Sequence, residues 1–251
     1  MKLLTLARDL KRRKARERQR LFVAEGVRAV EELLASPLPI RGALTAPQLT
    51  EASRGLALAA LLRSRGVEVQ EVSALEFGSA AETESPQGVI AIAEVPRRAL
   101  GDLPADWSGV LLVLDAVQDP GNVGTILRTA AALGSVATVS LPGTVDLWNA
   151  KVVRSGMGAH FRHPAFSTTW AELDAFRAGT GTVVFAADAA GVPAPMPVPS
   201  RVALVVGNEG AGLSAEARAR ADRIIALPLR GTVESLNVAV ATGILLHQLH
   251  Q

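Results

Sequence analysis

The sequence predicts an α/β protein whose C-terminal half is built on a parallel sheet. Two short apolar runs rich in β-branched residues, at 110–114 and 202–206, have the pattern of strands buried on both faces. Each run leads into a loop that contains glycine. The order of strand, loop, helix and strand over 110–141 is a βαβ unit, which predicts parallel strands. At 251 residues the chain is long enough for two domains.

Residues 1–95 predict a separate small α/β unit. An apolar stripe at helical spacing through 22–35 favours an amphipathic helix there. An Ala- and Leu-rich helix is expected at 54–64, and strands are expected at 40–44, 67–69 and 88–95. Residues 96–109 lack periodicity and contain two prolines and two glycines, so we expect them to be the linker between the domains.

The C-terminal half, 110–251, continues with alternating elements. A loop is expected over 115–124, followed by a helix that ends near Leu133. Further strands are expected at 136–141, 183–187, 202–206 and 224–227. The last helix is expected to begin near Ser235, an acceptable N-cap residue, and to end at Leu249. Because this helix is apolar on nearly all sides, the sequence predicts that it is buried.

The composition is ordinary for a soluble globular protein, with 49% hydrophobic and 20% charged residues. No apolar run approaches the ~20 residues that span a bilayer, so no membrane partner is expected. The N-terminus lacks the core of a signal peptide, so we expect a cytoplasmic protein. The absence of cysteine excludes disulfides, a thiolate nucleophile and cysteine-based metal sites. The four histidines show no metal-ligand pattern supported by carboxylates, so no metal is expected.

Positive charge is concentrated at the N-terminus. Residues 1–20 contain nine Lys or Arg against Asp9 and Glu17, a net charge of +7, so the rest of the chain carries −5 to give the total of +2. Such clustering favours a polyanionic partner, because each phosphate that is neutralised releases counterions. A solvated helical face or a frayed terminus is the alternative.

Glycine-rich segments follow two strand candidates and precede the last helix. In an open parallel sheet, ligands bind where the carboxyl ends of the strands meet such loops. The sequence therefore predicts a small ligand in a glycine-lined cleft formed by 119–124, 207–212 and 227–237. The GxGxxG fingerprint of a dinucleotide site is missing after the strand at 110–114, which argues against a nicotinamide cofactor.

Three segments carry a resemblance to a known family. They are AspProGlyAsnValGlyThrIleLeuArgThrAla at 119–130, GlyAsnGluGly at 207–210 and LeuProLeuArgGlyThrValGluSerLeuAsnVal at 227–238. In this order they resemble the signature motifs of the SpoU (TrmH-type) RNA ribose 2′-O-methyltransferases of the SPOUT superfamily. The resemblance implies S-adenosyl-L-methionine as cofactor, a homodimer, and a SPOUT domain over 110–251 with a C-terminal trefoil knot, against the general rule that chains are unknotted.

The N-terminal half resembles, more loosely, the substrate-binding domain that is often attached to this family. The resemblance rests on PheValAlaGluGlyValArgAlaValGluGlu at 22–32 and SerProGlnGlyValIleAla at 85–91. It implies that 1–95 is an RNA substrate-binding domain.

The resemblance also assigns the site residues. It implies that Arg128 acts on the ribose hydroxyl, either as a base with a strongly depressed pKa or as an electrostatic stabiliser. Asn122 is expected to orient Arg128, Glu209 to hold Arg128 or the substrate, and Ser235 and Asn237 to form the polar pair of the third motif. For the last two the alternative is helix capping, with Ser235 as N-cap and Asn237 in the first turn. The residues expected at the cofactor are Gly207, Asn208, Gly210, Leu227, Gly231 and Leu236.

The expected function is S-adenosylmethionine-dependent RNA ribose 2′-O-methylation, with rRNA favoured over tRNA because the N-terminal domain resembles that of rRNA-modifying members. A dinucleotide-dependent oxidoreductase is one alternative. A non-enzymatic RNA-binding or assembly factor on a methyltransferase scaffold is another, and Gly156, which stands where the family commonly has Ser, is the observation in its favour.

Overall fold

The computed structural model describes residues 2–230 and 235–250. The chain divides into two compact units, one of Met1–Arg97 with Trp148–Arg162 and one of Arg98–Leu147 with His163–Gln251. Among the described residues, no helix is long and apolar enough to cross a membrane. Each unit has its own sheet.

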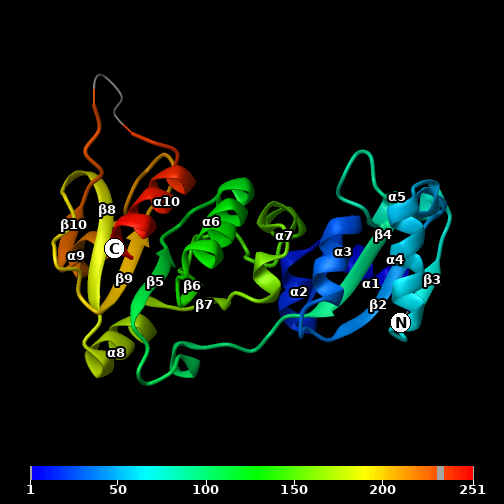
Figure 1. The fold of residues 1–251 in the computed structure, drawn as a ribbon, viewed down its shortest axis with the longest axis horizontal. Helices are drawn as coiled ribbons and strands as arrows, with labels where there is room; N and C mark the ends of the chain where they lie inside the picture. Colours follow the sequence, from blue (N-terminus) through cyan, green and yellow to red (C-terminus); the bar gives the residue numbers. More distant parts are fainter. Residues whose placement is uncertain (1, 231–234, 251) are drawn as a thin grey trace. The chain divides into compact units, whose positions relative to one another are not determined.

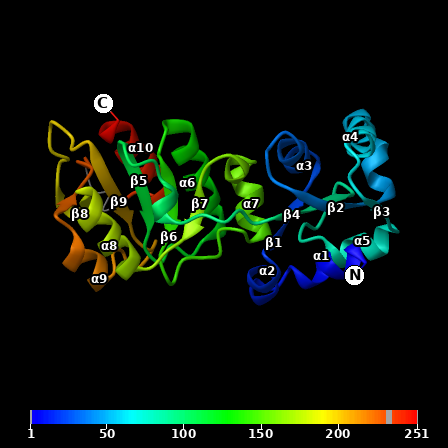
Figure 2. The ribbon, with the colours of Figure 1, turned by 90° about the horizontal axis from the view of Figure 1, so that it is seen from below.

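The first unit is a four-stranded mixed sheet covered on both faces by helices (Figures 1 and 2). Its strand order is β1 (Leu21–Glu25), β4 (Val89–Glu94), β2 (Ile40–Thr45), β3 (Val69–Glu71). The pairs β1–β4 and β2–β4 are antiparallel, and β2–β3 is parallel. Its helices are α1 (Leu3–Asp9), α2 (Arg13–Gln19), α3 (Val27–Leu34), η1 (Pro47–Glu51), α4 (Ser53–Ser64) and α5 (Ala74–Ala80). Helices α3 and α4 cover one face, and α1 and α5 cover the other.

The single helix expected over 22–35 is wrong, because its first residues form β1. Every residue of β1 is buried, and the strand pairs along its whole length with β4. Gly26 then adopts a φ of 98°, a left-handed conformation that ends the strand, and α3 begins at Val27. The apolar residues at helical spacing therefore belong to two elements that share one core.

The basic N-terminal run forms the ordered helices α1 and α2 and is not a frayed terminus. Its basic side chains are exposed, except for that of Arg16, which is 4% exposed. The Arg16 guanidinium donates to the carbonyl oxygens of Leu10 and Lys11 at 2.7 and 2.9 Å. This arginine is part of the fold, so it does not belong to the surface that a polyanion meets.

The segment Trp148–Arg162 belongs to the first unit although it lies within 110–251. It contains α7 (Ala150–Gly156) and η3 (Ala159–Phe161). The ring of Phe22 lies 4.6 Å from that of Trp148 and 5.7 Å from that of Phe161, measured between centroids. The segment ends there, because His163, the next residue, is buried against Thr138 in the second unit.

The second unit confirms the predicted parallel sheet. Its strand order is β10 (Arg223–Ile225), β8 (Val183–Val192), β9 (Arg201–Val206), β5 (Gly109–Leu114), β6 (Ala137–Ser140), β7 (Ala165–Ser167), with every neighbouring pair parallel. Helices α6 (Pro120–Leu133) and α10 (Val238–Leu249) lie on one face, and α8 (Trp170–Thr180) and α9 (Ala215–Arg220) lie on the other (Figure 2). The trefoil knot stays a prediction.

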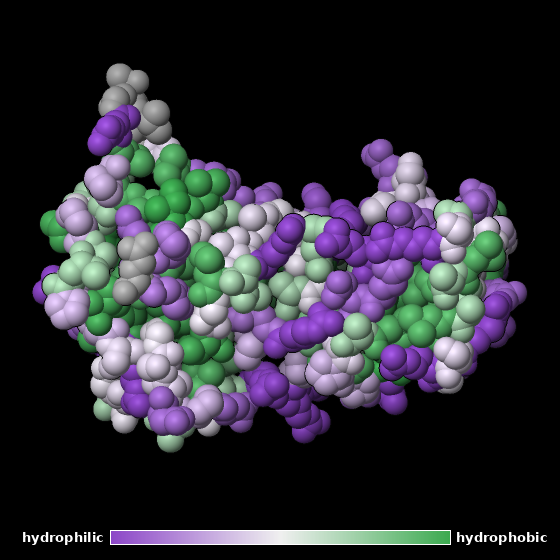
Figure 3. Space-filling view, in the orientation of Figure 1, coloured by the Kyte–Doolittle hydropathy of each residue, from purple (hydrophilic) through white to green (hydrophobic). Residues whose placement is uncertain are grey.

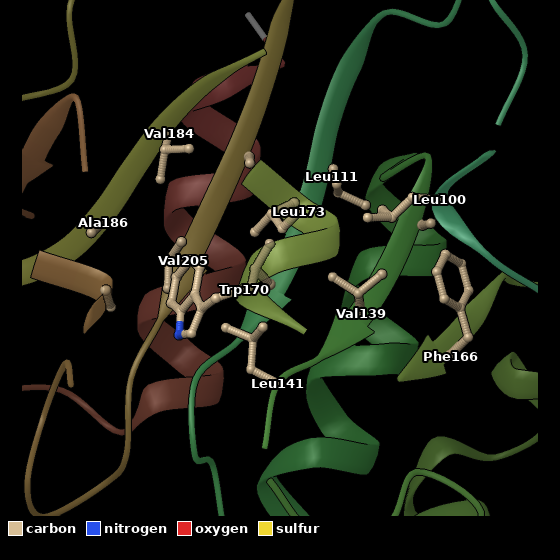
Figure 4. Packing of buried hydrophobic residues seen from close by; sticks show 14 of the residues in the cluster. Leu100, Leu111, Val139, Leu141, Phe166, Trp170, Leu173, Val184, Ala186 and Val205 are labelled. Carbon is tan, nitrogen blue, oxygen red and sulfur yellow. The ribbon is translucent and has the colours of Figure 1, made fainter. Parts of the chain in front are cut away.

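The core on the α8 and α9 side of this sheet includes residues from the segment expected to be a linker. Figure 4 shows Val139 and Val205 packed with Trp170 and Leu173 of α8. Leu100 and Trp107, from 96–109, are buried in the same cluster, Leu100 within η2 (Leu100–Asp102). These two side chains fix that part of the chain to the second unit.

The last helix differs from expectation at its start and in its burial. Its N-cap is Asn237, not Ser235, because the Asn237 side-chain oxygen accepts from the amides of Ala239 and Val240. Leu245 and Leu246 are buried, but Val240 is 52% and Ile244 39% exposed, because the helix packs only one side onto α6 and β5. The expectation of a wholly buried helix is therefore wrong for this chain on its own.

Candidate cofactor and active site

The carboxyl ends of β5 and β9 meet at one edge of the second sheet, because the two strands are adjacent and parallel. The loop after β5 ends at Asp119, whose side chain accepts from the amide of Asn122 and begins α6 at Pro120. The expected loop over 115–124 therefore stops at Asp119, and the motif's GlyAsnValGly forms the first turn of the helix. The loop after β9 begins at Gly207.

Gly207 lies where two chain segments cross at close range. A Cβ atom there would come within 2.4 Å of the carbonyl oxygen of Gly212. Asn208 and Gly212 exchange two backbone hydrogen bonds of 2.9 and 3.0 Å, which close the loop. No side chain fits at Gly207, so the first glycine of the motif is required by packing. At Gly210 the nearest atom to an added Cβ lies at 3.7 Å, so no such constraint applies.

Asn208 uses its side chain to brace the loop. Its oxygen accepts from the amides of Gly210 and Ala211, and its nitrogen donates to the carbonyl oxygen of Ala116, all at 2.9 Å. The residue lines the cavity described below, but the polar atoms of its side chain serve the loop. Its part in cofactor binding stays a prediction.

Glu209 joins the three sequence motifs in one hydrogen-bond network. Its carboxylate accepts from the amide of Gln118 at 3.2 Å, the amide of Asp119 at 3.0 Å and the side-chain nitrogen of Asn122 at 3.1 Å. The oxygen of Asn122 accepts in turn from the side-chain nitrogen of Asn237 at 2.9 Å. One residue from each motif thus contributes a side chain to this chain of contacts.

These contacts favour the ionised form of Glu209. Partial burial opposes the charge, but the hydrogen bonds from the Asn122 side chain and from backbone amides outweigh it and hold the pKa of Glu209 below its ordinary value. At neutral pH the carboxylate is therefore charged and accepts hydrogen bonds only.

A cavity of about 550 Å³ opens beside this network. It lies within the range usual for small-ligand sites. Its lining combines polar groups and glycines with apolar side chains of α10 and of Ile225, Ala226, Leu227 and Leu229. Of the sequence-predicted residues it is lined by Asn122, Gly207, Asn208, Glu209, Gly210, Leu227, Ser235, Leu236 and Asn237. Gly231 lies outside the described residues.

Arg128 is the one predicted catalytic residue that this cavity does not include. It lies on α6 and lines a second groove, of about 600 Å³, between α6 and α10. Thr125, Ile244 and His247 line the same groove. The two cavities share no lining residue among those described, and the part that Arg128 plays beside Glu209 and Asn237 stays a prediction.

Asp188 is a site residue that the sequence reasoning missed. It lines the cavity from β8, together with Ala187 and Ala189. Nothing in AlaAlaAspAlaAla distinguishes this carboxylate from a surface acid. The available signal was its place at the end of a predicted strand of a parallel sheet, where such sheets bind ligands.

The described residues contain no group of three or more His, Asp or Glu side chains that could hold a metal ion. His163 donates or accepts one hydrogen bond with the Thr138 hydroxyl at 2.8 Å, and burial lowers the pKa of His163 to about 4. This histidine is a neutral core residue.

Comparison with known proteins gives matches over both halves of the chain. The model of the SpoU rRNA Methylase family matches residues 109–247, and the model of the MRM3-like substrate binding domain matches residues 5–91. The 23S rRNA (guanosine(2553)-2′-O)-methyltransferase RlmP of Bacillus subtilis is 36% identical over 96% of this chain and 93% of its own length. The 23S rRNA (uridine(2479)-2′-O)-methyltransferase of Streptomyces viridochromogenes is 30% identical over 95% of this chain and 86% of its own length.

Solved structures give the same likeness. The crystal structure of an AdoMet-bound rRNA methyltransferase from Sinorhizobium meliloti superposes with a TM-score of 0.83 at 31% identity. The match covers 99% of this chain and 94% of that one.

The Glu209 network predicts the effect of one conservative change. Glu209→Gln replaces one of the two acceptor oxygens by an NH2 donor. Because Gln118 and Asp119 donate to different oxygens of Glu209, one of these two amides loses its acceptor. We expect hydrogen exchange of the peptide that spans 115–124 to accelerate several-fold, measured by mass spectrometry at neutral pH. Glu216→Gln, on α9 and outside the network, is the control and should leave exchange in this peptide unchanged. Equal protection in Glu209→Gln and the native chain would show that the carboxylate does not hold this loop.

Proposed function

Because the chain belongs to the SpoU rRNA Methylase family, we propose that it is an RNA ribose 2′-O-methyltransferase that uses S-adenosyl-L-methionine. The observation that carries the proposal is the network of Glu209, Asn122 and Asn237 at the edge of a cavity of cofactor size. Each member comes from a different motif, and the network lies at the edge of the sheet where ligands of parallel α/β folds bind.

The residues around the cavity fit this cofactor. S-adenosylmethionine supplies a methyl group activated by a positively charged sulfonium. The cavity offers glycine backbone at Gly207 and Gly210 for close approach and apolar side chains at Leu227 and Leu236 for an adenine ring. Its two charged lining side chains among the described residues, Asp188 and Glu209, are both acidic, which suits a cationic ligand.

The protein's remaining task is to position and polarise the ribose hydroxyl. We assign Arg128 to stabilising the negative charge that develops on the 2′ oxygen, because a guanidinium is a positively charged hydrogen-bond donor without an acceptor atom. Asn122 and Glu209 hold the first turn of α6, the helix that carries Arg128. Asn237 fixes the start of α10 against Asn122, and Ser235 lines the cavity beside it.

We propose that two copies associate through α6 and α10, each with the trefoil knot that the family resemblance implies. The groove that holds Arg128 lies between these helices, and Val240 and Ile244 of α10 are exposed beside it. Figure 3 shows apolar surface over α10 and the residues that lead into it. A dimer of this kind removes that surface from water and places Arg128 at the interface.

We propose that residues 1–95 bind RNA, that 96–109 join them to the methyltransferase domain at 110–251, and that the protein acts in the cytoplasm. The exposed basic side chains of α1 and α2 give the first unit a surface for phosphate. The two relatives described above that cover both halves of the chain carry names that specify 23S rRNA, which favours rRNA over tRNA.

The dimer predicts a concentration-dependent mass. Sedimentation of the native chain should give twice the mass of 26.2 kDa at micromolar concentration. Val240→Asp with Ile244→Asp should shift it to the monomer, because burying two carboxylates at an interface is unfavourable. Leu56→Asp with Leu61→Asp, on the exposed face of α4, is the control and should remain dimeric. A monomeric native chain would contradict the proposed interface.

The basic surface predicts a salt-dependent loss of RNA affinity. Arg12, Arg13 and Lys14 are exposed, and changing all three to Gln removes up to three phosphate contacts. We expect the slope of log affinity against log salt to fall by about 0.7 for each contact with single-stranded RNA. The same triple change at Arg41, Arg63 and Arg65 of the first unit is matched in charge and should have little effect. Equal losses in both triple variants would show that only net charge matters.

The reaction is tested with labelled S-adenosylmethionine and total RNA that lacks the modification. The native chain should label one 2′-O-methyl position in rRNA. Arg128→Ala should lose transfer by 100-fold or more, within the range typical for one electrostatic donor, while it binds S-adenosylmethionine with unchanged affinity in calorimetry. Arg128→Lys keeps the charge and should retain part of the activity. Cofactor binding without transfer by the native chain would instead favour an RNA-binding or assembly factor on a methyltransferase scaffold.

A further inference from the structure

Asp188 lines the cofactor cavity in a position that neither the motifs nor the network explains. It lies on β8, and its side chain is 17% exposed. Among the described lining residues only Asp188 and Glu209 carry charge. Glu209 accepts from three donors that belong to the adjoining loop and helix. Asp188 is the acidic group that lines the cavity from β8.

The carboxylate of Asp188 is held in place and has acceptor capacity to spare. One oxygen accepts from the amide of Ala190 at 2.9 Å, and the other accepts from the guanidinium of Arg218 on α9. The Ala190 amide, opposed by partial burial and assisted by Arg218, holds the pKa of Asp188 below its ordinary value. A carboxylate offers about four acceptor sites, so both oxygens can accept from a ligand as well.

The sheet order separates Asp188 from Asn122, the member of the network that follows β5. Strand β9 lies between β8, which carries Asp188, and β5, whose following loop leads to Asn122. Strands in a sheet are about 4.8 Å apart, so β8 and β5 are about 10 Å apart at the level of the sheet. The end of the cofactor that reacts belongs beside the network. The nucleoside therefore extends toward β8 and β10, where Ile225 and Leu227 supply the apolar lining.

We propose that Asp188 recognises the cofactor's ribose by accepting a hydrogen bond from its 2′ or 3′ hydroxyl. The assignment rests on the proposed function, because it requires a nucleoside cofactor in this cavity. A carboxylate at the edge of a parallel sheet performs the same task for the ribose of dinucleotides. Arg218 acts as a positioning residue, because it holds the carboxylate charged and in one orientation.

If the pair of Asp188 and Arg218 served only to stabilise the fold, the aspartate would not need to line the cavity. Asp174 and Arg220 form such a pair on the α8 and α9 side of the sheet, with a contact of 2.8 Å, and neither residue lines the cavity. Exposed pairs of that kind contribute little to stability. Asp174→Ala is therefore a matched control. It removes an aspartate that pairs with Arg220 of α9, the helix that also carries Arg218.

The test measures binding of S-adenosylhomocysteine and its 2′-deoxy and 3′-deoxy forms by calorimetry. This probe lacks the sulfonium charge, so it reports on the ribose contact without the attraction between opposite charges. The native chain should bind S-adenosylhomocysteine roughly 10- to 100-fold more tightly than at least one deoxy form, the range expected for a hydrogen bond to a charged group. Asp188→Ala should bind all three with equal affinity, whereas Asp174→Ala should discriminate as the native chain does.

Two further measurements keep the outcomes distinct. Arg218→Ala keeps the carboxylate and should retain discrimination in reduced form, while far-UV circular dichroism verifies that each variant is folded. Discrimination that persists in Asp188→Ala, or that is absent from the native chain, overturns the assignment of Asp188 and leaves the methyltransferase proposal standing. A native chain that binds neither S-adenosylmethionine nor S-adenosylhomocysteine overturns both.

Discussion

The candidate site depends on one carboxylate that joins two loops, the one that carries it and the one after β5. Glu209 follows β9, and its partners Gln118, Asp119 and Asn122 follow β5. Loops at the end of adjacent strands have no regular pairing of their own, so their relative position must come from side chains. A single anionic acceptor with several N–H donors is well suited to this, because hydrogen bonds to charged groups are stronger than those between neutral groups. The position of α10 follows from the same contact through Asn122 and Asn237.

The sequence was most informative where burial alone determines structure. Strands buried on both faces, such as β5 and β9, appear as continuous apolar runs, and their parallel pairing follows from the helix between successive strands. The sequence was misleading where the same apolar residues fit both the spacing of a helix and that of a strand. LeuPheValAlaGlu is compatible with a helix stripe, yet all five residues are buried in β1 by partners distant in sequence, such as Trp148. The spacing of apolar residues within a short segment carries no information about a packing partner more than a hundred residues away.

The site was predictable in its composition and less so in its geometry. Nine of the predicted residues line one cavity, because the motif residues follow strands that end at the same edge. The positions of two residues follow only from the three-dimensional structure. Arg128 lies on α6 but lines a different groove, a matter of helical phase that a motif does not encode. Asp188 belongs to no motif, and its relevance depends on the order of strands in the sheet, which places β8 beside β9.

The path of the chain through Trp148–Arg162 has a consequence for how this protein can be divided. The chain leaves the second unit after Leu147, completes the first unit with α7 and η3, and returns at His163. No single cut separates the two units as complete structures. A fragment that ends before the parallel sheet begins would lack the rings of Trp148 and Phe161 and would expose Phe22, which is fully buried in the whole chain. A chimera that takes one unit from a relative must therefore take Trp148–Arg162 from the same protein as the first sheet. Recombination at the apparent boundary near residue 97 would instead join a first sheet from one protein to the α7 and η3 of another.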